Sequence, residues 1–155
     1  LKYNLIDHVT HIIITAHFSD HLDEESLHFF NKKIPIYTTL EASKALIKLG
    51  FTNVNVVKAN NTYEINSFSL KIFKAGKPYN TTTFSYLLCD SRSKVFHEPH
   101  MFNTKVEIND VDACIVIAQK QTKGLISLLL SIKESYKQIN LMPSSCRKVG
   151  DSLCL

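Results

Sequence analysis

The stretch His11–Leu27 constrains the fold more than any other part of the chain. It opens with the apolar run Ile12–Thr15, which is typical of a strand covered on both faces in a parallel sheet. A short polar turn follows, and a helix is then expected behind Asp23, a good N-cap with Glu24 and Glu25 in the first turn. A buried strand that ends in a polar turn ahead of a helix commonly places metal ligands at the open end of a sheet. We therefore expect the functional residues to lie at this turn.

Alternating strand and helix signals continue from this stretch to residue 58. The expected elements are a strand over Ile12–Thr15, a helix ending near Asn31–Lys33 ahead of Pro35, a strand over Ile34–Thr39, a helix ending at Gly50, and a strand over Val54–Lys58. Thr38 and Glu41 match a capping box for the second helix. The order β-α-β-α-β favours parallel strands joined by right-handed crossovers.

Beyond residue 60 the pattern changes to short strand-like segments separated by Asn, Ser, Gly and Pro. These segments are Thr62–Ile65, Ser69–Lys74, Phe84–Cys89 and Lys94–His97, with a hairpin turn over Asp90–Ser93. Their spacing predicts an antiparallel meander. The remaining signals are a strand over Val111–Ala118, a helix over roughly Lys123–Gln138 and a short strand over Ile139–Met142. The fold class is therefore α/β with a mixed sheet, and residues 1–155 form a single domain.

Composition excludes several classes of protein. The 155 residues suffice for one domain, and 45% of them are hydrophobic, enough for one core. The net charge of +4 comes from scattered basic residues, so no nucleic-acid partner is expected. No apolar run approaches the roughly 20 residues of a membrane span, so no membrane partner is expected. The four cysteines form no CxxC pair, which favours reduced thiols and a cytoplasmic protein.

Two short motifs carry a resemblance to a known superfamily. Thr15–His21, T-A-H-F-S-D-H, resembles the T-H-x-H-x-D-H signature of the metallo-β-lactamase fold superfamily. Phe96–His100, F-H-E-P-H, resembles the Y-E-P-H strand end found in the ascorbate-phosphate-lactonase-like branch, in a subgroup with an eroded histidine motif. Asp112–Ala118 also matches that branch, and the resemblance spans roughly Val9–Leu141. It implies an αβ/βα sandwich that is incomplete here, with the first strands missing before Leu1 and an atypical tail after about residue 142.

The resemblance also implies metal-assisted hydrolysis, in which bound metal lowers the pKa of water from about 16 towards 7. When the motif is aligned on Asp20 and His21, its two alternating histidines fall on Ala16 and Phe18, which cannot bind metal. Glu98 replaces the bridging aspartate only if its loop shifts by one residue. The implied site is therefore degenerate.

A single zinc, iron or manganese ion, or no metal at all, is the expected content of such a site. The ion would be held by Asp20 and His21 with one of His17, His97 or His100. The candidate metal ligands are His17, Asp20, His21, Glu98 and His100, and Asp20 is the candidate catalytic residue.

Each of these residues also has a plainer interpretation. His17 is equally typical of a solvated loop, and Asp20 of a turn cap that accepts from backbone N–H groups. His21 is equally explained by a structural hydrogen bond to a neighbouring carbonyl. His97 and His100 flank a proline and are equally explained as exposed residues.

Two functions remain open. The first is weak metal-dependent hydrolysis of a small ester, lactone or phosphoester, which makes a small molecule the substrate. The second is a catalytically silent scaffold that binds a partner or ligand, and the site chemistry favours it. An incomplete sheet exposes an edge that tends to pair with another chain, so we also expect a homodimer or a fold that depends on a partner.

Overall fold

The structure is a computed structural model that describes residues 3–75, 83–99, 108, 110–118 and 139–143. A 3₁₀-helix over Tyr3–His8 leads into alternating strands and helices: β1 (Ile12–Ile14), α1 (Glu24–Leu27), β2 (Ile36–Thr38), α2 (Leu40–Lys48) and β3 (Val54–Val56). Only strands follow in the described part: β4 (Thr62–Ile65), β5 (Phe68–Lys74), β6 (Phe84–Cys89), β7 (Lys94–Glu98), β8 (Ala113–Ala118) and β9 (Ile139–Pro143). The predicted helix over Lys123–Gln138 lies outside the described residues.

The strands form two sheets. β1, β2 and β3 make a three-stranded parallel sheet in that order, with Ile13 beside Tyr37 and Tyr37 beside Asn55. β4 to β9 make a six-stranded sheet in sequence order. Its strands are antiparallel from β4 to β7 and parallel from β7 to β9. This confirms the predicted change from parallel βα units to a meander.

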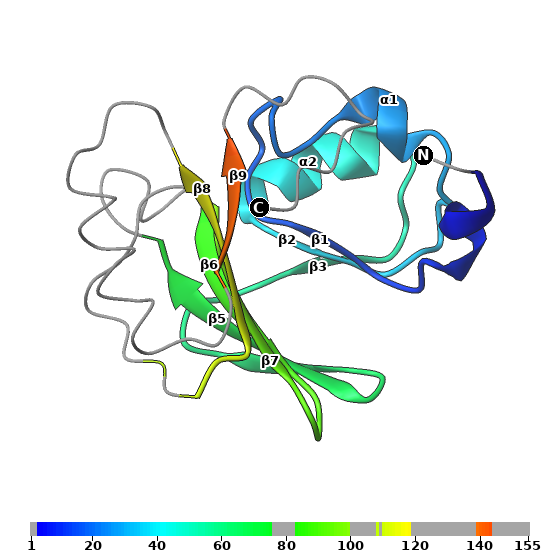
Figure 1. Ribbon diagram of the computed structural model, residues 1–155. Helices are drawn as coiled ribbons and strands as arrows, with labels where there is room; N and C mark the ends of the chain where they lie inside the picture. Colours follow the sequence, from blue (N-terminus) through cyan, green and yellow to red (C-terminus); the bar gives the residue numbers. More distant parts are fainter. Residues whose placement is uncertain (1–2, 76–82, 100–107, 109, 119–138, 144–155) are drawn as a thin grey trace.

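The small sheet lies between the helices and the large sheet (Figure 1). Successive side chains of a strand point to opposite faces, so each strand serves two cores. Ile14 and Ile36 pack towards the helices with Leu46, whereas Ile13 and Tyr37 pack against the large sheet. The large sheet supplies Leu70, Ile72 and Phe84 to this inter-sheet core.

A third core covers the other face of the large sheet. It is formed by Phe96, Val111 and Cys114, with Phe73 and Leu87 packed against it. The large sheet is therefore buried on both faces at β7, and each residue of β7 can be assigned to one face. This assignment decides which side chains reach the turn after β1.

The helix starts show one confirmed and one wrong prediction. Asp23 is the N-cap of α1 and accepts from Glu25 N at 3.3 Å, as predicted. The N-cap of α2 is Thr39, which accepts from Ala42 N at 3.2 Å, and not Thr38. The Thr38 hydroxyl instead donates to the carbonyl of Ile14 at 2.8 Å, a contact between β1 and β2.

α1 ends at Leu27, several residues before the predicted Asn31–Lys33. His28, Phe29 and Phe30 each donate to the carbonyl three residues earlier, so the chain tightens into 3₁₀-type turns there. α2 ends at Lys48 with Leu49 as its C-cap, and Gly50 follows as the predicted stop, with a φ of 88° in the left-handed region that favours glycine. Within the described residues, no helix is long and apolar enough to cross a membrane.

Candidate metal site

The turn after β1 is closed by its own backbone. His21 and Leu22 donate their N–H groups to the carbonyl of Phe18, at 2.9 and 2.8 Å. This turn brings the imidazole of His21 back over the end of the strand, where its Nδ1 shares a hydrogen bond of 2.7 Å with the Thr15 hydroxyl. This hydrogen bond fixes the orientation of the imidazole ring at the end of β1.

His21 and Asp20 sit side by side but in different environments. The side chain of His21 is 6% exposed and that of Asp20 is 69% exposed, with 3.7 Å between Nε2 and Oδ2. The two groups are thus near enough to share an ion, with the carboxylate on the solvent side. The hydrogen bond between Nδ1 of His21 and the Thr15 hydroxyl is a structural contact within the turn.

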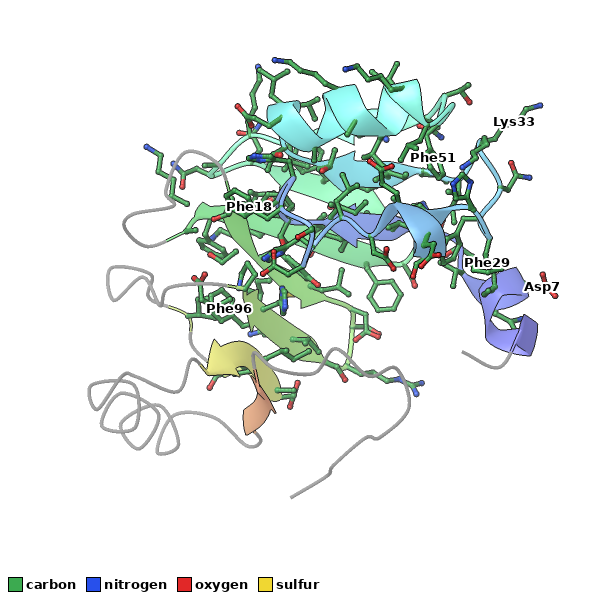
Figure 2. The ribbon with its side chains drawn as sticks, turned by 90° about the horizontal axis from the view of Figure 1, so that it is seen from above. Asp7, Phe18, Phe29, Lys33, Phe51 and Phe96 are labelled. Carbon is green, nitrogen blue, oxygen red and sulfur yellow. The ribbon has the colours of Figure 1, made fainter. Side chains whose placement is uncertain are left out.

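The two positions where the motif places its alternating histidines hold apolar side chains. Ala16 is fully buried at 0% exposure. Phe18 is half-buried and lies between His17 and His21, at ring-centroid distances of 4.5 and 6.4 Å. His17 itself is exposed, as its plainer interpretation predicts. Figure 2 shows Phe18 at the opposite side of the view from Phe29 and Asp7.

On β7, His97 faces the turn. Its ring lies against Tyr86 at a centroid distance of 5.0 Å, and Tyr86 belongs to the inter-sheet core. Burial, together with a smaller effect of His21, lowers the pKa of His97 to about 4. His97 is therefore a neutral imidazole at pH 7, and its interpretation as a simply exposed residue is wrong.

Glu98 faces the other way. Phe96 lies two positions before Glu98, on the same face of β7, and it belongs to the third core. Burial raises the pKa of the Cys114 thiol to about 11, and the carboxylate of Glu98 contributes to that rise, so the two groups share this face. Glu98 is 1% exposed and is separated from the turn by the sheet itself.

The five predicted ligands therefore have different outcomes. Asp20 and His21 are brought together, His17 is exposed, Glu98 lies on the far face of β7, and His100 lies outside the described residues. Within the described part of the chain, no group of three or more His, Cys, Asp or Glu side chains could hold a metal ion. Catalytic zinc sites commonly use three protein ligands, so these residues do not fit a two-metal centre.

The described residues do not complete a single-ion site either, since only Asp20 and His21 of the predicted ligands are brought together. Nδ1 of His97 is buried and has no hydrogen-bond partner among the described residues. The sequence pattern predicted His97 only as one of three alternatives for the third metal ligand. Because successive side chains of a strand point to opposite faces, His97 and Glu98 lie on opposite faces of β7.

Solved structures with this fold come from several bacteria. A protein from Parabacteroides distasonis, provisionally named a metal-dependent hydrolase, has a TM-score of 0.69 at 17% identity, over 90% of this chain and 68% of its own. The metallo-β-lactamase fold protein YhfI from Bacillus subtilis has a TM-score of 0.67 at 16% identity, over 88% and 66%. An isothiocyanate hydrolase from Delia radicum gut bacteria has a TM-score of 0.63 at 14% identity, over 93% and 65%.

These likenesses show the fold, which is the predicted metallo-β-lactamase type of α/β sandwich. The chain spans about two thirds of the length of these structures. No family model matches the sequence, and no curated protein matches it.

Proposed function

We propose that the chain is a hydrolase-like protein with a degenerate metal site, from the ascorbate-phosphate-lactonase-like branch with an eroded histidine motif. The site holds at most one zinc, iron or manganese ion, and the protein hydrolyses a small ester, lactone or phosphoester weakly at most. We place it in the cytoplasm. The neighbours support this proposal through their names, since two of the three are named as hydrolases.

The observation that carries the proposal is the pair of apolar residues in the turn. Ala16 is fully buried and Phe18 packs against His21, so neither position can supply a ligand. His21 and Asp20 remain together at 3.7 Å and are the residues that would hold an ion. A bound ion would supply a water of lowered pKa. The chain's own contribution is the Thr15–His21 hydrogen bond, which fixes the imidazole orientation.

A catalytically silent scaffold is the second candidate. The same hydrogen bond anchors His21 without a metal, and the described residues do not complete a metal site. The exposed Asp20 would then cap the turn or meet a bound ligand. The two candidates differ in whether purified protein contains metal.

Elemental analysis of protein purified without chelator separates them. We expect zinc, iron or manganese close to one equivalent, lost in Asp20→Ala and in His21→Ala. The control is His28→Ala, which removes an exposed histidine at the end of α1. Protein that contains no metal, and whose melting temperature is the same with and without chelator, would leave only the scaffold.

A further inference from the structure

The hairpin between β4 and β5 closes with a very short loop. Ile65 pairs with Phe68, so the loop consists of Asn66 and Ser67 alone, and both are exposed. Asn66 has a φ of 54°, whereas the φ of Ser67 is not positive. A two-residue hairpin loop in which only the first residue has a positive φ has the pattern of a type II′ turn.

This turn type sets where the backbone nitrogen of Ser67 lies relative to the side chain of Asn66. The first central residue of a type II′ turn has a ψ of about −120°. In an L-amino acid, that torsion makes Cβ eclipse the next backbone nitrogen about the Cα–C bond. Closure of a succinimide ring requires this same eclipsed arrangement. The turn therefore holds Asn66 in the backbone conformation from which the next nitrogen can attack its side chain.

The attacking nitrogen must also be able to lose its proton. In the part of the chain that the structure describes, the N–H of Ser67 and the side chain of Asn66 take part in no hydrogen bond. Asn60 is the contrasting case, because it is also exposed and has a φ of 68°. The N–H that follows it, on Asn61, donates to the carbonyl of Lys58 at 3.2 Å. The structure therefore protects Asn60 and leaves Asn66 open to attack.

We propose that Asn66 is a site of spontaneous deamidation in the folded protein. The Ser67 nitrogen gives its proton to hydroxide and bonds to Cγ of Asn66. The bond from Cγ to Nδ2 breaks, and Nδ2 takes a proton from water and leaves as ammonia. Water then opens the succinimide at either of its carbonyl carbons. The products at position 66 are aspartate and isoaspartate, and each carries a negative charge that asparagine lacks.

The isoaspartate product would change the hairpin itself. It places the side-chain methylene in the main chain, so the loop becomes longer, and loop length sets the register of a hairpin. Ile65, the residue before the loop, is 6% exposed and belongs to the inter-sheet core. A change of register at the Ile65–Phe68 pair would therefore move a core side chain and weaken the packing of β4.

The test is prolonged incubation of the full chain in mildly alkaline buffer, with one sample folded and one unfolded in guanidinium chloride. Digestion and mass spectrometry then measure the fraction of each peptide that has gained the mass difference between an amide and a carboxylate. In the folded chain we expect Asn66 to react several-fold faster than Asn60. In the unfolded chain both turns are lost, so the ratio of the two rates should fall.

Asn66→Gly is the matched control, because glycine is the usual first residue of a type II′ loop and has no side chain to react. It should keep the stability of the unaltered chain, abolish the mass gain at this loop and leave the rate at Asn60 unchanged. An equal ratio of rates in folded and unfolded chains would overturn the role of the turn. A folded chain in which Asn66 does not react would overturn the site. Both results come from the unaltered chain, so they stand even if the variant folds poorly.

Discussion

At the scale of single residues, burial changes what the candidate side chains can do. His97 is buried beside Tyr86, and burial lowers the pKa of His97 to about 4, so its imidazole is neutral at pH 7. The same burial raises the pKa of Tyr86 to about 12. A neutral imidazole can bind metal without first losing a proton. The same burial makes the protein's stability depend on pH.

We predict that metal-free protein loses stability as the pH falls from 6.5 towards 4. His97 has a folded-state pKa of about 4 against an ordinary value of 6.5. Between these values the unfolded chain binds more protons than the folded one, so the free energy of unfolding falls with pH, by about 3 kcal/mol in all. Urea unfolding in chelator at several pH values measures this. His97→Phe should make the free energy of unfolding depend less on pH, whereas His28→Ala should leave that dependence unchanged. Equal pH slopes in wild type and His97→Phe would rule out this origin.

The sequence predicted that Asp20 and His21 lie together, but it did not predict the face of β7 on which Glu98 lies. Both residues of the pair lie in one short turn, and local spacing is enough to bring them together. Glu98 was favoured because of its chemistry, as a carboxylate near the place of an aspartate. Its position depends on which face of β7 meets the small sheet, and that is set by packing between distant strands.

At the scale of elements, α2 shows how one residue can shift a helix start. Thr38 and Thr39 are both suitable caps by sequence. Thr38 is fully buried and its hydroxyl bonds to Ile14 in β1, so the cap falls to Thr39. Because β1 lies 24 residues away, no local pattern reports this contact. The strands were easier to predict, since Thr62–Ile65 and Phe84–Cys89 carry their own turn signals.

We predict that Thr39→Ala destabilises the protein by about 1 kcal/mol, because Ala42 N loses its acceptor. Glu41→Ala should change the free energy of unfolding by less than about 0.5 kcal/mol, since Thr39 carries the cap without it. Urea unfolding at pH 7 compares the two variants. A larger loss in Glu41→Ala than in Thr39→Ala would restore the capping box that the sequence predicted.

At the scale of the whole molecule, the layered arrangement was predictable and the assembly is open to test. The order of strand and helix signals was sufficient for the α/β class and for the change from parallel to antiparallel pairing. In the described part of the chain, β1 and β3 each pair on one side only. Unpaired strand edges tend to recruit another chain. That tendency is the physical basis of the homodimer we propose.

We predict that light scattering will give the mass of a dimer for the purified chain. Val56→Lys should shift it towards the monomer, because Val56 is 40% exposed on the edge strand β3 and lysine there opposes strand pairing. Ile47→Lys is the control, an exposed apolar residue on α2, and should leave the mass unchanged. A clean monomer for the unaltered chain would contradict the dimer.

The fully enclosed methyl group of Ala16 limits which side chains this turn can accept. An imidazole at this position needs room that the surrounding atoms already fill, and overpacking of this kind costs about 1–3 kcal/mol. A histidine introduced here alone would therefore destabilise the chain unless the side chains around it were made smaller at the same time.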